Sequence, residues 1–138
     1  MTTTYPISAA YADGQVLSAS NVNQIAGGVN DLAALQINAQ TGTSYTLVLT
    51  DSAKLITLTN ASAIALSVPT NASVAFATGT QIALYQGGAG QVTISAVTPG
   101  TTSIRSQGSK TKTNGQYSMV VLTKIAADEW VIAGNTSA

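Results

Sequence analysis

The spacing of apolar residues divides the chain into two parts with different predicted secondary structure. Between residues 18 and 36, apolar side chains recur at intervals of three, four and three, at Val22, Ile25, Val29 and Leu32. This interval places them on one stripe of an α-helix, and serine hydroxyl groups at the start of the segment can accept the free N–H groups of a first turn. The pattern therefore predicts one α-helix over residues 18–36.

The partner of this apolar stripe is open to two interpretations. Short amphipathic helices usually pack on their own domain, but the same spacing is also the a/d seam of a short coiled coil between identical chains. The narrow stripe and the polar face of Asn and Gln favour the second interpretation. Two features oppose it: the seam covers about two heptads where sustained coiled coils need three or four, and Gly27 and Gly28 each lower the helix propensity by about 1 kcal/mol.

From residue 45 onward the apolar period changes to two, the period of β-strands, as in the alternating residues 64–68. Residues 37–44 are mostly small or polar, and we expect a linker there. Short apolar runs separated by turn residues about every 8–12 positions are typical of sandwiches and barrels. Residues 117–125 are apolar on both faces and predict a central strand. The predicted fold is mainly β, with a short N-terminal arm and one α-helix followed by an antiparallel β-sandwich or barrel-like domain over residues 45–138.

Turn signals and one short repeat lie within this β-rich part. The glycine-rich residues 87–90 and the Asn-Gly pair at residues 114–115 each predict a tight hairpin turn. The tetrapeptide TNAS occurs at residues 59–62 and again at residues 70–73, and predicts two similar turns that open consecutive strands. A solenoid would need at least about three such copies, so the repeat alone does not predict one.

Residues 1–17 are polar and irregular, and predict an arm that either orders on a partner surface or frays as a terminus. In the first case its scattered apolar residues would anchor it: Tyr5, Ile7, Tyr11, Val16 and Leu17.

The scarcity of charge changes the picture of the surface. Charged residues make up 7% of the chain and the formal net charge is zero, against about 25% charged residues in ordinary domains. The surface must then consist largely of hydroxyl and amide groups. Binding to nucleic acid is not expected, because it needs clustered Lys and Arg. No apolar run approaches the roughly 18 residues that cross a bilayer, so no membrane partner is expected either.

Candidate chemistry is sparse. The chain has no Cys and no His, which removes the commonest metal ligand and general base, and we expect no cofactor and no enzymatic activity. The only adjacent carboxylates, Asp128 and Glu129, would point to opposite faces of a strand. Three aromatic residues, Tyr85, Tyr117 and Trp130, are candidates for stacking on a sugar ring, although a place in the core is the commoner role for each.

Several segments together resemble a module of bacteriophage head fibres, capsid decorations and tail-fibre-like proteins. In chain order they are the entry sequence DGQVLSAS at residues 13–20, then YTL at 45–47, KLITL at 54–58, NASAI at 60–64, GTQI at 79–82, GQVTI at 90–94 and WVI at 130–132. Their order and spacing cover most of the chain. The resemblance implies a structural protein without enzymatic activity that forms a homotrimer, attaches to the particle by its N-terminal part and projects its β domain outward.

The resemblance and the helix together predict a trimeric capsid decoration or head-fibre protein. Residues 18–36 would form the threefold seam, and the arm would dock on the major capsid protein or another virion protein. The short chain favours the capsid surface over a tail fibre, which normally carries an extended shaft. The alternative is a tail-fibre or host-recognition module that binds a surface glycan through the three aromatic residues.

Overall fold

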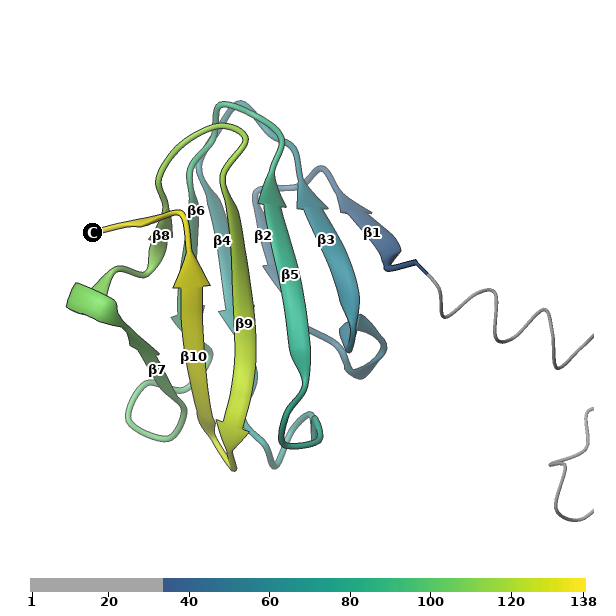
Figure 1. Ribbon diagram of the computed structural model, residues 1–138, viewed down its shortest axis with the longest axis vertical. Coiled ribbons are helices and arrows are strands. Elements are labelled where there is room, and N and C mark those ends of the chain that lie inside the picture. The colour runs from purple at the N-terminus through teal and green to yellow at the C-terminus, as the bar shows by residue number, and fades with distance from the viewer. Residues whose placement is uncertain (1–33) are drawn as a thin grey trace, which may run out of the picture. The chain divides into compact units, whose positions relative to one another are not determined.

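The computed structural model describes residues 34–138, which contain eleven strands in two sheets (Figure 1). In chain order the strands are β1 (Gln36–Gln40), β2 (Ser44–Thr46), β3 (Lys54–Leu58), β4 (Ile64–Val68), β5 (Gln81–Gln86), β6 (Val92–Ala96), β7 (Ser103–Ser106), β8 (Lys112–Thr113), β9 (Met119–Ala126), β10 (Glu129–Gly134) and β11 (Thr136–Ser137). Two short 3-10 helices, η1 (Leu49–Asp51) and η2 (Gln107–Ser109), lie between them. The predicted arm and every residue assigned to the helical seam lie outside the described range.

The two sheets have mixed strand directions. Six strands form one sheet in the order β1-β3-β5-β9-β10-β7, and five form the other in the order β11-β8-β6-β4-β2. The prediction of a mainly β fold is confirmed. The prediction of an antiparallel arrangement is wrong, because five of the nine strand pairings are parallel: β1–β3, β3–β5, β10–β7, β2–β4 and β4–β6.

Four of the five parallel pairings arise because the chain changes sheet after every strand from β1 to β6. Each of the strands β3 to β6 therefore lies beside the strand two positions earlier and runs in the same direction. The pairs β1–β2, β3–β4 and β5–β6 form three successive coils, stacked as in a solenoid. The TNAS repeat does not mark these coils, since residues 59–62 join β3 to β4 whereas residues 70–73 lie in the loop after β4 at the other end of the strands.

Turns at one end of the coils rest directly on one another. The Gly90 N–H donates to the carbonyl oxygen of Asn60 at 2.8 Å, and the Asn60 side chain donates to the carbonyl oxygen of Thr41 at 2.8 Å. A Cβ atom on Gly90 would lie 1.8 Å from the carbonyl oxygen of Ser62, so this contact requires glycine. Residues 87–90 therefore form a turn that crosses from the six-stranded to the five-stranded sheet and stacks on the turn that contains Asn60. The predicted hairpin there is wrong.

A true hairpin, β9–β10, is inserted between β5 and β7 and makes the sheet mixed. Its strand β9 is central, as the apolar run predicts. The Asn-Gly pair at residues 114–115 does not close a hairpin, because β8 before it pairs in the five-stranded sheet and β9 after it belongs to the six-stranded sheet.

The compact β unit begins at Gln36, earlier than the sequence predicts. Residues 36–40 form β1, so the predicted helix cannot extend to residue 36 and the predicted linker at residues 37–44 is reduced to the turn at residues 41–43. The polar composition of β1 suggested a linker. Instead, its inward side chains bond to one another, with Gln40 Nε2 donating to Asn38 Oδ1 at 2.8 Å.

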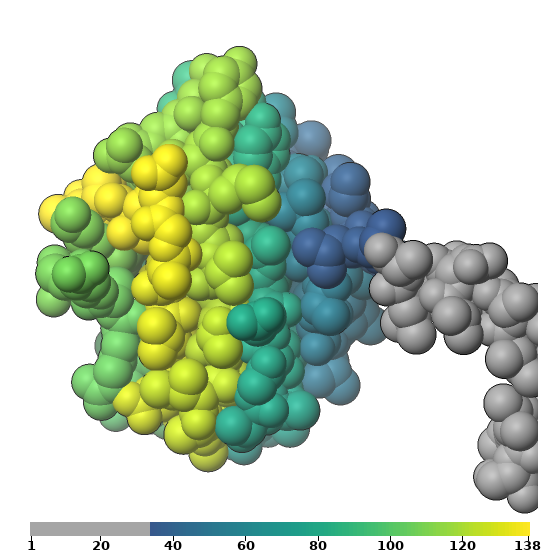
Figure 2. Space-filling view, in the orientation of Figure 1, coloured from purple at the N-terminus to yellow at the C-terminus, as the bar shows by residue number. Residues whose placement is uncertain are grey.

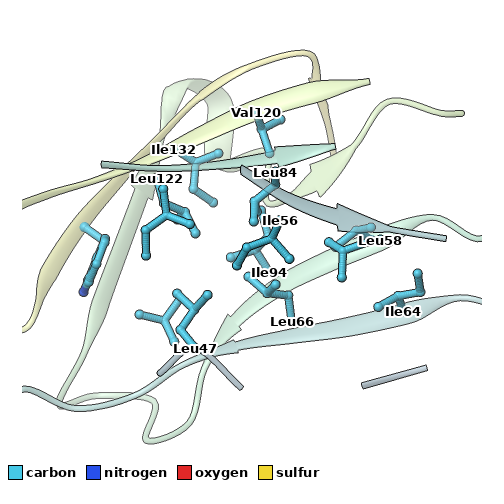
Figure 3. Packing of buried hydrophobic residues seen from close by; sticks show 14 of the residues in the cluster. Leu47, Ile56, Leu58, Ile64, Leu66, Leu84, Ile94, Val120, Leu122 and Ile132 are labelled. Carbon is cyan, nitrogen blue, oxygen red and sulfur yellow. The ribbon is translucent and has the colours of Figure 1, made fainter. Parts of the chain in front are cut away.

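Side chains from both sheets meet in one hydrophobic core (Figure 3). The largest contributors alternate along their strands, such as Ile56 and Leu58 of β3 or Ile64, Leu66 and Val68 of β4, and all are fully or almost fully buried. Because successive residues of a strand point to opposite faces, the intervening residues face away from the core. The molecule is therefore a two-layer sandwich in which each sheet also has an outer face.

Candidate functional site

Trp130 lies in the core and cannot serve as a ligand platform. Only 2% of its surface is exposed, and its ring meets Phe76 edge to face with centroids 5.4 Å apart and planes at 86°. Such pairs stabilise a core beyond their buried area. Trp130 is thus removed from the set of candidate ligand-facing aromatic residues.

The other two aromatic candidates meet on the outer face of the six-stranded sheet. The rings of Tyr85 and Tyr117 stack with centroids 6.5 Å apart and planes at 24°. Tyr117 is 67% exposed and has a φ of 70°, a left-handed conformation that is rare for a bulky residue. Its N–H donates to the carbonyl oxygen of Gln86 at 2.7 Å, which fixes this loop beside the end of β5. The pair is therefore a fixed aromatic element that the strands present at the surface.

The tyrosine pair adjoins a wider surface that the sequence analysis did not identify. One outward-facing residue from each of five neighbouring strands forms a continuous line across the sheet, hereafter the apolar row: Ile37, Leu55, Ala83, Val121 and Ala133. All five are apolar, and Ile37 at the β1 end is 66% exposed. Polar residues are the usual choice on the open face of a two-layer sandwich. A line of apolar side chains in that position is a mark of an interaction surface.

The rows on either side of the apolar row are also uncharged from β1 to β10. The row on the tyrosine side consists of Ala39, Thr57, Tyr85 and Met119, and the row on the other side contains Gln81, Thr123 and Val131. The nearest charges are Arg105, the β7 neighbour of Val131, and Glu129, the first residue of β10, which form an ion pair with each other. Figure 2 views this face, with β1, β3, β5, β9 and β10 side by side and no other described segment covering them.

The outer face of the five-stranded sheet has a different chemistry. Its cross-strand rows are Ser44, Ala65, Thr93, Lys112 and Ser137 in one line, and Thr46, Ser67 and Ser95 in the next. Hydroxyl groups dominate both rows. These hydroxyl groups suit direct contact with water. The low charge content of the sequence predicts a surface made largely of hydroxyl and amide groups, and this outer face has that character.

A buried polar cluster lies between the sheets at their β1 and β2 edges. The carboxylate of Asp51 accepts hydrogen bonds from Asn38 Nδ2 at 2.8 Å, the Tyr45 hydroxyl at 2.9 Å and the Val48 N–H at 2.9 Å. Burial, followed by the hydrogen bond to Asp51, raises the pKa of Tyr45 above its ordinary value. These bonds use three acceptor positions of the carboxylate to hold β1, β2 and η1 together, so the cluster is structural.

Two further charged side chains, the buried Lys124 and the half-buried Asp128, hold loops in place. Lys124 Nζ donates to the carbonyl oxygen of Phe76 at 2.7 Å and to Asn71 Oδ1, which fastens the loop between β4 and β5. Asp128 accepts from the Asn71 N–H at 2.6 Å and the Thr102 hydroxyl at 3.2 Å. Both side chains are therefore engaged in structural hydrogen bonds. Lys124 makes no bond with a serine hydroxyl, which a lysine could otherwise activate as a nucleophile.

Residues 34–138 contain no group of three or more His, Cys, Asp or Glu side chains that could hold a metal ion. The same residues include no helix long and apolar enough to cross a membrane. Comparisons of the chain with protein-family models, curated proteins and solved structures find no match. The outer face of the six-stranded sheet is therefore the candidate site on structural grounds alone.

The sequence contained a partial signal for this face. The apolar run at residues 117–125 predicts a central strand that is apolar on both faces, and its inner residues, such as Val120 and Leu122, are buried. Its outward residues, Met119 and Val121, lie on the candidate site instead. Strand order was needed to place them beside Leu55 and Ile37, which are distant in the sequence.

Proposed function

We propose that the chain is a non-enzymatic structural protein of a bacteriophage particle, a trimeric capsid decoration or head-fibre protein. The observation that carries this proposal is the uncharged, largely apolar outer face of the six-stranded sheet. Contiguous apolar surface of this kind serves association with other proteins. The ordered segments that resemble phage appendage modules supply the class of particle.

In this proposal the parts of the chain have separate roles. The arm at residues 1–17 docks on the capsid through its apolar residues, and residues 18–35 form the threefold seam through the stripe from Val22 to Leu32. The β unit projects outward. Three chains on one axis make three linked contacts with a symmetric site, so weak individual contacts give tight attachment.

Deletion of residues 1–17 tests the division of roles. The shortened protein should keep a mass of three chains in sedimentation equilibrium and should lose co-sedimentation with capsids that lack the protein. Tyr117→Ala, which alters the β unit and leaves the arm intact, is the matched control and should still bind. Continued decoration of capsids by the shortened protein would refute the anchoring role.

A second candidate function is recognition of a host glycan by a tail-associated module. The stacked tyrosine pair favours it, because Tyr117 is exposed and its exposed neighbour Gln116 adds an amide, which donates to the carbonyl oxygen of Gly87 at 3.0 Å. Sugar rings stack on such aromatic faces and bond to such amides. Glycan-array binding that Tyr117→Ala removes, with the circular dichroism spectrum unchanged, would support this function. Phe76→Leu, a change in the core, is the control and should retain binding.

A further inference from the structure

We propose that the outer face of the six-stranded sheet packs against the same face of two further copies of this chain, around the trimer axis. This inference rests on the proposed trimer and assigns it a second contact besides the helical seam. The face is defined by the apolar row and the two uncharged rows beside it. The binding partner of this face is the same face of other copies of the chain, and three considerations support that choice.

The first consideration is charge. Identical surfaces that meet around an axis bring every charged side chain close to its own copies, and juxtaposed like charges oppose association. From β1 to β10 the three rows carry no charged side chain, and the nearest charges, Arg105 of β7 and Glu129 at the start of β10, form an ion pair with each other. The face can therefore approach its own copies without repulsion.

The second consideration is the reach of the chain. Leu32 is the last residue of the predicted seam, and Ile37, the first residue of the apolar row, follows five positions later. Five residues span at most about 18 Å even when fully extended. A contact between copies that begins at Ile37 would therefore follow the predicted seam almost directly in the sequence.

The third consideration is width. Five strands from β1 to β10 make four spacings, or about 19 Å. Three such faces arranged as the sides of a triangular prism, with one further strand spacing at each corner to separate the outermost strands of neighbouring copies, would each lie about 7 Å from its axis, compared with about 5 Å for half the distance at which two sheets pack face to face. Side chains of ordinary size then fill the prism.

The predicted helix of the same chain is a poorer occupant. Its apolar stripe has four residues spaced as a narrow a/d seam, whereas a helix that covers a surface normally presents an apolar arc of about 100° or more. If the seam joins identical helices, the same four residues are no longer free to cover five strands.

Charge substitution on the two outer faces tests the proposal in the full chain. Val121→Lys places a lysine in the middle of the apolar row, and Ile37→Lys places one at its exposed edge, where folding should be least affected. Ser67→Lys is the matched control, because Ser67 is equally half-buried on a central strand of the opposite outer face. Analytical ultracentrifugation gives the trimer dissociation constant of each variant, and circular dichroism checks its fold.

We expect Val121→Lys and Ile37→Lys to raise the dissociation constant about 100-fold or more, and Ser67→Lys to change it by less than about threefold. If the parent is a trimer and both lysine variants retain its dissociation constant, the face proposal is overturned while the trimer stands. If the parent sediments as a monomer at all concentrations, the trimer proposal itself is overturned, and with it this one.

Met119 offers a second measurement that needs no substitution. It is 48% exposed in the single chain and lies on the proposed face, so peroxide should oxidise it slowly in the trimer and faster after dilution below the dissociation constant. Free methionine in the same solution is the reference. Protection that does not change on dilution would show that the chain's own residues cover the face, and full reactivity at every concentration would show that it is open. Either result overturns the proposal.

Discussion

The two outer faces of the sandwich differ although one alternating chain builds both. The six-stranded sheet presents a continuous apolar row with uncharged neighbours, while the five-stranded sheet presents rows of Ser and Thr. Overall composition averages the two faces and hides the difference. The contrast shows that the outer side chains are sorted by sheet, so that one outer face is largely apolar and the other is rich in hydroxyl groups.

Loss of Trp130 should affect both faces at once, because the two sheets share one core. Trp130→Ala removes a fully packed indole and its edge-to-face contact with Phe76, and should lower the free energy of unfolding by about 4 kcal/mol. Urea denaturation followed by far-UV circular dichroism measures the change. Tyr117→Ala, at an exposed site, should cost less than about 1 kcal/mol. A comparable loss in both variants would contradict the assigned core.

Asp51 should be the next most sensitive position, since it ties the edges of both sheets together. Asp51→Ala leaves Asn38, Tyr45 and the Val48 N–H without their shared acceptor, and should cost about 3 kcal/mol. The neighbouring Ser52→Ala is the control and should stay within about 0.5 kcal/mol. Hydrogen exchange should show faster opening of β1 and β2 in the Asp51 variant. Unchanged exchange there would argue against a role for this cluster in the edge strands.

The stacked turns keep the coils in register, and a slip of one residue would exchange inner and outer side chains. Gly90→Ala places a methyl group against the backbone of Ser62, and should lower the free energy of unfolding by about 1–3 kcal/mol. Gly115→Ala is the matched control, because no heavy atom lies within 4 Å of the added carbon. Equal thermal midpoints for the two variants would mean that the coils do not need this contact.

The smallest effect on folding is expected from replacing outer serines of the five-stranded sheet with apolar residues, which makes this face resemble the outer face of the six-stranded sheet. Ser67 and Ser95 are cross-strand neighbours, and replacing both with valine should change the free energy of unfolding by no more than about 0.5 kcal/mol per site. It should nevertheless promote association, visible in sedimentation velocity as species larger than the parent. If no such species form, apolar character alone does not make an outer face associate.

Periodicity in the sequence predicts the strands better than their partners. The alternating residues 64–68 become β4, and the apolar run at residues 117–125 becomes most of β9. Neither pattern contains the direction of the neighbouring strand, which depends on whether the connection returns in the same sheet or crosses to the other. The glycines at residues 87–90 predict a turn in either case, and only the contact with the Asn60 turn selects the crossing.

The candidate site was harder to predict for the same reason. Leu55, Ala83 and Val121 become neighbours only through the order β3-β5-β9, which joins segments far apart in the sequence. Tyr85 and Tyr117 were identified by residue type, but Trp130 shares that type and is buried, since aromatic rings suit both places. The polar composition of residues 37–40 predicts a linker, yet they form most of β1, because the inward side chain of Asn38 bonds to Asp51.

The insertion of β9 and β10 between β5 and β7 has a consequence for synthesis on the ribosome. Strand β7 has β10 as its neighbour in the sheet, yet β7 ends at Ser106 and β10 begins at Glu129. The coils β1 to β6 can assemble in the order in which they emerge, whereas β7 must wait beside an incomplete sheet until β10 has been translated. A chain that stalls before Met119, where β9 begins, would thus expose the unpaired edge of β5, and nascent chains on one messenger could pair there with one another.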